Sequence, residues 1–275
     1  MKTTLLLIGL TFCTLCVAHS QGLIVSYEET TKVVLPDVSQ VENPQARAAL
    51  ESRLKDMNRD VTKAAHLQLN NGVSIYKTEA YKVEDLGRTS GTKTIVEGNV
   101  TGTFSSQFIN MSPHTIYKNH HDKLRLSQVT VDGKEYIIEE PLAEYQWKIG
   151  KKQKMLSGYQ CIEATTKTSG GTKITAWYTP DIPVSDGPSH YCGLPGLILY
   201  VEIGEGSRIL SCTSIEQIDN FAEIEAPSQG EKISRTQYDT IVADWRAQMD
   251  QQQRNRNVDE RGDNFVRQGR TTIVR

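Results

Sequence analysis

Tight turns that close β-hairpins constrain the fold of this chain more than any other feature. Asn71-Gly72 and Asp132-Gly133 each stand between segments in which apolar and polar residues alternate. Both dipeptides favour the left-handed backbone of a two-residue hairpin turn. A third turn, Gly170-Gly171, separates two more strand-like segments. Short consecutive strands joined by tight turns predict an antiparallel meander, because parallel strands need long crossovers between them.

Other segments have the alternating or continuous apolar pattern of strands. We predict strands at residues 23–27, 67–69, 73–75, 94–103, 124–131, 136–138, 145–149, 159–166, 173–178, 197–202 and 209–213.

Two segments have helical periodicity instead. Asn43-Pro44 is typical of a helix start, and apolar residues follow at roughly helical spacing as far as Val61. Ser234 and Gln237 form a capping-box pattern before an apolar stripe that ends at Met249. We therefore expect an α+β fold. Its sheet is predicted to be strongly curved and mostly antiparallel, like a half-barrel, with one N-terminal and one C-terminal helix packed on it.

The first twenty residues are typical of a secretory signal peptide. Lys2 supplies a positive charge, an apolar segment follows, and Ala18-His19-Ser20 precedes an expected cleavage between Ser20 and Gln21. The apolar segment is shorter than a membrane-spanning helix, which needs about 20 apolar residues. We predict an exported mature chain, periplasmic or associated with the outer membrane, without a transmembrane segment.

The mature chain is predicted to contain one domain. Residues 21–250 form a single β-rich unit, and residues 251–275 form a polar, basic tail that is expected to be disordered. The formal net charge of −2 lacks the basic excess of a nucleic-acid-binding protein.

Three cysteines remain after cleavage of the signal peptide, namely Cys161, Cys192 and Cys212. In an oxidising compartment we expect one disulfide and one free thiol. Cys161 and Cys192 are the favoured pair because each lies near a predicted strand in the same half of the chain, although the spacing leaves the pairing open. A thiol nucleophile with His190 as its base is the alternative, but no cysteine-protease signature surrounds these residues.

Histidines and tryptophans are the other candidate site residues. His120 and His121, with His114 nearby, form the most metal-like group, but adjacent side chains on a strand point to opposite faces. We therefore expect no metal and no other cofactor. Trp147 and Trp177 lie in strand-like segments, where aromatic side chains usually belong to the core or, alternatively, line a ligand cavity.

A proline- and glycine-rich stretch precedes the strand predicted at residues 197–202. It contains Gly187-Pro188 and then Gly193-Leu194-Pro195-Gly196-Leu197-Ile198. Proline restricts the backbone, while glycine permits close approaches that a side chain would block. The hexapeptide contains no nucleophile, acid or metal ligand. We therefore predict a stiff loop that docks into a β core.

These residues carry a resemblance to a known family. The hexapeptide, preceded by Trp147-Lys148-Ile149, Gly158-Tyr159-Gln160-Cys161, Ala176-Trp177-Tyr178-Thr179 and Ile182-Pro183, resembles the GLPGLI family over about residues 130–215. The resemblance implies a secreted protein of Gram-negative envelopes, of uncharacterised function and without known catalytic residues.

The sequence leads to two functional hypotheses. The first is a non-enzymatic envelope protein that binds an apolar ligand, a peptide or another envelope protein. The second is an envelope hydrolase or thiol-dependent enzyme that acts on peptides. Side chains that fill the sheet face would argue against a small ligand, and buried or paired thiols would argue against a thiol enzyme. The identity of the partner and the oligomeric state stay open.

Overall fold

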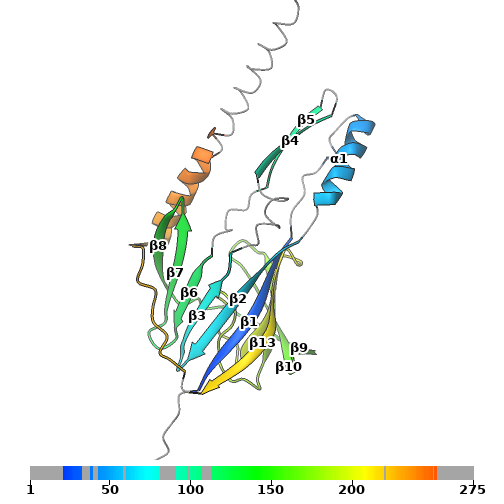
Figure 1. The fold of residues 1–275 in the computed structure, drawn as a ribbon. Coiled ribbons are helices and arrows are strands. Elements are labelled where there is room, and N and C mark those ends of the chain that lie inside the picture. Colours follow the sequence, from blue (N-terminus) through cyan, green and yellow to red (C-terminus); the bar gives the residue numbers. More distant parts are fainter. Residues whose placement is uncertain are drawn as a thin grey trace, which may run out of the picture.

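The computed structural model describes residues 21–32, 38–39, 43–57, 60–80, 91–97, 100–106, 113–219, 221–249 and 251–252. Twelve strands form one sheet in the order β14-β8-β7-β6-β3-β2-β1-β13-β12-β11-β10-β9 (Figure 1). These strands are β1 (Gln21–Thr31), β2 (Val61–Asn70), β3 (Val73–Thr78), β6 (Thr115–Asn119), β7 (Leu124–Val131), β8 (Lys134–Pro141), β9 (Lys148–Leu156), β10 (Tyr159–Lys167), β11 (Lys173–Thr179), β12 (Leu197–Ile203), β13 (Arg208–Asp219) and β14 (Glu231–Ile233).

The hairpin turns predicted from the sequence are confirmed. Asn71 and Gly72 have φ angles of 47° and 72°, and Asp132 and Gly133 have φ angles of 51° and 75°. They join β2 to β3 and β7 to β8 in antiparallel pairs. Consecutive positive φ angles match the right-handed twist of the strands that such turns connect. Within the described part of the chain, β14 with β8 is the one parallel pair of the main sheet.

The predicted α+β half-barrel is wrong. The chain is mostly β, and its main sheet is mixed, neither closed nor strongly curled. β4 (Gly91–Glu97) and β5 (Val100–Ser106) form a separate hairpin, although one strand was predicted there. The N-terminal helix α1 (Pro44–Met57) lies beside β4 and away from the main sheet (Figure 1).

The start of α1 was predicted correctly from the sequence, but its end was not. Asn43 Oδ1 accepts a hydrogen bond from the Gln45 backbone N–H at 2.9 Å, so the predicted helix start is confirmed. Val61, expected as the last apolar position of the helix, instead begins β2 and is 1% exposed. The helix ends at Met57 and the strand begins at Val61, so the spacing of apolar residues alone does not show where one ends and the other begins.

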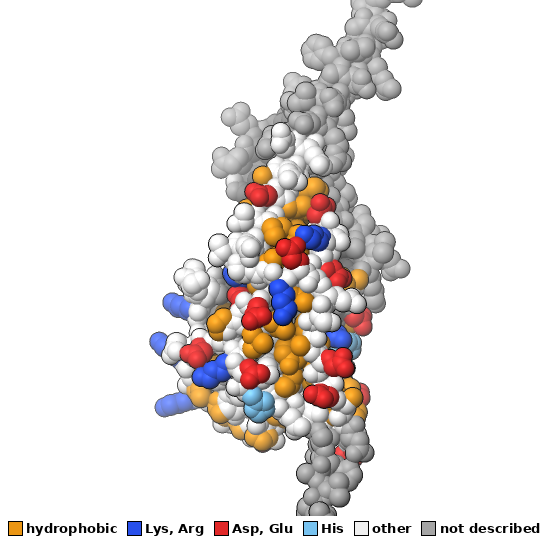
Figure 2. All heavy atoms as spheres, turned by 90° about the vertical axis from the view of Figure 1, so that its left-hand side faces the viewer, with side chains coloured by type: hydrophobic (Ala, Val, Ile, Leu, Met, Phe, Trp, Pro, Cys, Tyr) orange, Lys and Arg blue, Asp and Glu red, His pale blue; other side chains and the backbone are white. Residues whose placement is uncertain are grey.

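The C-terminal helix, residues 235–249, does pack on the sheet. Its predicted capping box is confirmed, because Ser234 N–H donates to Gln237 Oε1 at 2.8 Å and Gln237 N–H donates to Ser234 Oγ at 3.2 Å. Tyr238 and Ile241 from this helix pack against buried residues of β8 and β14. On the face seen in Figure 2, hydrophobic side chains form a band bordered by charges of both signs.

Removal of this cap tests the C-terminal helix. We expect Ser234→Ala to lower the free energy of unfolding by about 1 kcal/mol, because the Gln237 N–H loses its side-chain acceptor. Urea unfolding followed by circular dichroism measures the change. Ser234→Asp keeps an acceptor and should stay close to the wild type; equal losses in both variants would contradict the capping role.

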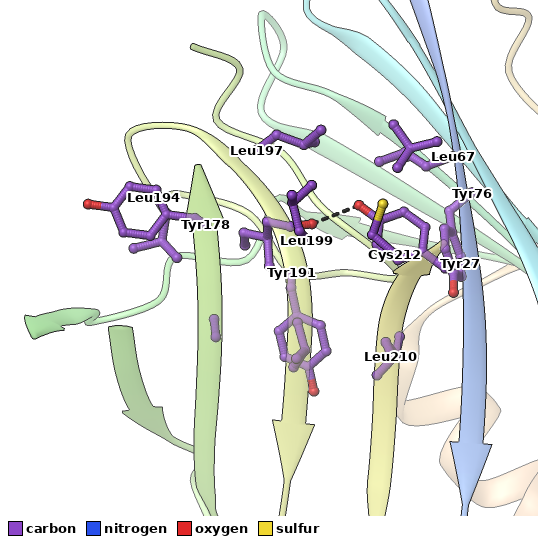
Figure 3. Packing of buried hydrophobic residues seen from close by; sticks show 14 of the residues in the cluster. Tyr27, Leu67, Tyr76, Tyr178, Tyr191, Leu194, Leu197, Leu199, Leu210 and Cys212 are labelled. Carbon is purple, nitrogen blue, oxygen red and sulfur yellow. Dashed lines mark hydrogen bonds between the residues drawn. The ribbon is translucent and has the colours of Figure 1, made fainter. Parts of the chain in front are cut away.

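The main core lies between the strands and the connection from β11 to β12. Its fully buried side chains include Leu67, Leu197 and Leu199. Tyr27 O–H donates to the Ile198 carbonyl at 2.7 Å, across 171 residues of sequence, and Figure 3 shows this bond as a dashed line. The core thus ties the first strand to the strand that follows the hexapeptide.

The predicted signal peptide, residues 1–20, lies outside the described residues, and so does almost all of the predicted tail, residues 251–275. Among the described residues, no helix has the length and apolar content needed to cross a bilayer.

Candidate functional site

Residues 180–196, which connect β11 to β12, form the segment that we call the motif loop. It is anchored by backbone hydrogen bonds, from Leu197 N–H to the Ile182 carbonyl at 3.0 Å and from Ile198 N–H to the Asp186 carbonyl at 2.9 Å. Leu194 is 1% exposed and lies in the main core (Figure 3). The hexapeptide is therefore docked into the β core, as its composition suggested.

Two glycines of the motif loop stand where no side chain fits. A Cβ atom on Gly187 would lie 2.6 Å from Ile198 Cβ. Gly196 has a φ of +153°, and a Cβ atom there would lie 2.1 Å from the Thr179 carbonyl oxygen. Both glycines thus allow the loop to approach the neighbouring chain closely.

A buried charged cluster joins the motif loop to β6. Lys118 Nζ contacts Asp186 Oδ1 and donates to the Gly187 carbonyl at 2.7 Å. His120 Nε2 lies 3.0 Å from Asp186 Oδ2, and Gly187 N–H donates to Asp186 Oδ1 at 2.6 Å. Lys118 and Asp186 are 0% and 1% exposed, so their charged groups are removed from water.

The pKa of Asp186 follows from these neighbours. Burial alone would raise it, but the positive charge of Lys118 and the contact with His120 lower the pKa of Asp186 to about 2. The motif loop is therefore held on β6 by a carboxylate with partners on both oxygens.

A second buried cluster surrounds Glu29 of β1. Its carboxylate accepts hydrogen bonds from Tyr76 O–H at 2.7 Å and from Arg208 Nη2 at 2.9 Å, and Lys63 Nζ lies 3.5 Å away. Burial raises the pKa of Glu29, but Arg208, Lys63 and Tyr76 together lower it below its usual value. Glu29, which is 1% exposed, thus joins β1, β2, β3 and β13.

Ser189 and His190 are the one adjacent hydroxyl–imidazole pair in the motif loop. Ser189 has a φ of 55°, and its Oγ lies 3.1 Å from His190 Nδ1. Ser189 is only 2% exposed, and the His190 ring packs on Tyr191 with centroids 4.4 Å apart. Burial lowers the pKa of His190 to about 3. The Ser189 hydroxyl is therefore closed to substrates, whereas the His190 ring is partly exposed.

All three cysteines are buried free thiols in this structure. The two sulfurs of the predicted pair have separate contacts, because Cys161 Sγ lies 3.7 Å from the Tyr159 carbonyl and Cys192 Sγ lies 3.6 Å from the Ala143 carbonyl. Burial raises the pKa of Cys161 to about 11 and also raises those of Cys192 and Cys212. A buried thiol with a raised pKa is a poor nucleophile.

The candidate metal ligands have separate partners. His120 faces Asp186, whereas His121 Nε2 lies 2.8 Å from the Asn71 carbonyl, and His114 Nδ1 lies 3.2 Å from Thr78 Oγ1. No group of three or more His, Cys, Asp or Glu side chains suited to a metal ion occurs among the residues that the structure describes.

The two candidate tryptophans serve different contacts. Trp147 Nε1–H donates to the Cys192 carbonyl at 2.8 Å, so this ring holds the motif loop from outside. Trp177 lies under Lys154, whose Nζ is 4.3 Å from the Trp177 ring centroid and 4.4 Å from that of Tyr200. Both rings are partly buried and pack against the main core.

Sequence reasoning missed the charged clusters. Lys118 had a detectable signal, because it alternates with Ile116 in a strand and so lies on the inward face. Asp186 directly precedes Gly187-Pro188, where a polar residue is typical of a solvated loop. Lys118 and Asp186 are 68 residues apart in the sequence, so no local sequence pattern predicts their contact.

Comparisons with known proteins give limited matches. A family model described as "Protein of unknown function (Porph_ging)" matches residues 166–200, which include the motif loop. No curated protein matches. Two structures of PNGF-II, in space groups P21 and C2, are 14% and 13% identical to the chain, with TM-scores of 0.48 and 0.46.

Both PNGF-II alignments cover 82% of this chain, which spans only about a third (34% and 33%) of those chains. An uncharacterized conserved protein from Thermus thermophilus is 7% identical with a TM-score of 0.36, over 78% of this chain and 90% of that protein.

Proposed function

We propose that this chain is an exported envelope protein of the GLPGLI family and that it binds a partner protein or peptide without catalysing a reaction. The hexapeptide at residues 193–198 and the surrounding family-model match at residues 166–200 support the family. The secretory pattern of residues 1–20 supports the location in the envelope.

The exposed edge strand β9 carries the proposal of partner binding. β9 ends the main sheet and pairs with β10 alone among the strands that the structure describes, so one row of its backbone groups has no described strand beside it. Ile149 and Met155 on this strand are 55% and 65% exposed. An edge strand with exposed apolar side chains is a common site for the addition of a partner strand.

The charges of β9 favour one kind of partner. Lys148, Lys151 and Lys152 are exposed, and residues 150–152 bulge opposite Glu163. Lysines and bulges on an edge discourage pairing between copies of the same strand, since like charges would face each other. Lys152 Nζ already lies 3.3 Å from Glu163 Oε1, but Lys148 and Lys151 add positive charge at the edge. This charge attracts acidic groups, so we propose an extended, acidic segment of an envelope protein or peptide as the partner.

The other hypotheses have less support. A small apolar ligand needs an open sheet face, but the motif loop fills the inner face of the sheet with Tyr191 and Leu194, which are 4% and 1% exposed. The thiol-dependent enzyme needs an accessible thiolate, but the exposed fractions of Cys161, Cys192 and Cys212 are 0%, 2% and 8%.

Site-specific photocrosslinking in the native envelope tests the proposed surface. A photoreactive side chain at position 149 or 155 should give the same covalent adduct with a second protein or peptide. The matched control is position 135, an exposed residue of β8 at the other end of the sheet, where no such adduct is expected. Absence of adducts from positions 149 and 155, or equal adducts from position 135, would contradict binding at β9.

A further inference from the structure

The buried contact between the motif loop and β6 combines the two reactants of an amide bond. Lys118 offers a primary amine and Asp186 offers a carboxyl group, and the two side chains touch where they are only 0% and 1% exposed. We propose that Lys118 and Asp186 are joined by an intramolecular isopeptide bond, which forms after folding with release of one water molecule.

Burial favours this product over the ion pair. In water, hydration stabilises the ammonium and carboxylate ions and so favours them over an amide. Lys118 and Asp186 lose that hydration on folding, and a buried ion pair recovers its desolvation cost only partly. A neutral amide avoids the cost, so the equilibrium inside the protein moves toward condensation.

The surroundings already fit an amide group. Lys118 Nζ lies 2.7 Å from the Gly187 carbonyl, which can accept the amide N–H. Gly187 N–H lies 2.6 Å from Asp186 Oδ1, which becomes the amide carbonyl oxygen. Both polar groups of the product therefore have partners, as buried polar groups require.

The same geometry supports the reaction. The fold holds the amine against the carboxyl group, which replaces an encounter in solution by an intramolecular step. One proton passes from Lys118 Nζ to the Asp186 carboxyl group, which carries it on Oδ2, and the neutral amine then attacks Cγ. The negative charge that develops on Oδ1 is stabilised by Gly187 N–H.

His120 is placed to complete the step. Its Nε2 lies 3.0 Å from Asp186 Oδ2, and its side chain is 24% exposed, so the site has contact with solvent there. His120 carries a second proton from Nζ to the departing Oδ2 hydroxyl, which leaves as water. The bond from Nζ to Cγ forms, the bond from Cγ to Oδ2 breaks, and Nζ keeps one hydrogen as the amide N–H.

Intact mass measured under denaturing conditions tests the bond. Glutamine has nearly the mass of lysine but no amine, so Lys118→Gln is a matched control for the full chain. We expect the wild type to be lighter than Lys118→Gln by about 18 Da, the mass of the released water. Equal masses would overturn the proposal and leave a buried ion pair.

Peptide mapping of the wild type gives a test that needs no folded variant. Trypsin should fail to cleave after Lys118, and one branched peptide should contain both Lys118 and Asp186. Detection of the two residues in separate, unmodified peptides would overturn the bond. In time courses of newly made protein, His120→Gln should form the bond about 100-fold more slowly; an equal rate would overturn the role of His120.

Discussion

Replacement of Gly196 by alanine is expected to lower the free energy of unfolding by about 4 kcal/mol, because backbone strain and overpacking combine at this position. The φ angle of +153° disfavours any side chain. The new Cβ atom would also lie 2.1 Å from the Thr179 carbonyl oxygen and 3.0 Å from Pro180 N. These are backbone atoms at the end of β11, so no side-chain rotation relieves the contact.

Urea unfolding of Gly196→Ala beside Gly171→Ala separates the two causes. Gly171 also has a positive φ, +84°, but a Cβ atom there meets nothing within 4 Å. We expect Gly171→Ala to cost only about 1 kcal/mol, from strain alone. If the two substitutions cost the same, the close approach of the motif loop to β11 would be refuted.

The hexapeptide's role in the fold was predictable from its own residues, and its partners were not. Proline and glycine followed by Leu197 and Ile198 indicate a stiff loop before a buried strand, and the structure has that arrangement. The contacts of Gly187 with Ile198 and of Gly196 with Thr179 depend on tertiary packing. The sequence thus indicates that glycine is needed without indicating what it approaches.

Some strands were predictable from local sequence signals and others were not. β2, β3, β7 and β8 are marked by hairpin turns, which are local signals and therefore visible in sequence. β9 was expected to end at Ile149, but it begins at Lys148 and continues to Leu156, because an exposed edge strand needs no alternation of apolar residues. The shape of the sheet was predicted wrongly since twist and curvature are set by the whole set of strands.

The buried charges explain why the candidate site was not predictable. Glu29 lies 34 residues from Lys63 in sequence and 179 residues from Arg208, yet all three meet within one site. Each residue alone is typical of a solvated strand position. Glu29 and Lys118 differ from solvated residues only in lying on the inward face of the sheet. That position depends on how the strands pair.

Stability should fall steeply when the pH falls below about 6.5, the usual pKa of histidine. Burial, followed by the charge of Arg125, lowers the pKa of His190 to about 3. Burial, followed by the charge of Lys63, lowers the pKa of His114 to about 4, although Glu29 partly opposes this. Both histidines therefore stay neutral in the folded protein at a pH where they are charged in the unfolded chain.

The direction of the effect follows from proton binding. Between about pH 6.5 and the lowered folded pKa values, the unfolded chain binds more protons than the folded protein, so acid favours unfolding. Each histidine contributes a loss of about 1.4 kcal/mol per pH unit in this window. Above about pH 6.5 neither histidine contributes a slope. Glu29, whose pKa is also lowered, adds a loss of the same sign only below its usual pKa of about 4.3.

Urea midpoints measured at intervals from about pH 7.5 to about pH 4.5 would test this expectation. The wild type should lose about 2.7 kcal/mol per pH unit in the steepest part, from both histidines together. His190→Phe keeps an aromatic ring against Tyr191 but cannot take up a proton, so it should lose about half of this slope even if its stability at neutral pH is lower. A wild-type stability that stays flat from neutral pH down to about pH 5 would contradict the lowered pKa values of both histidines.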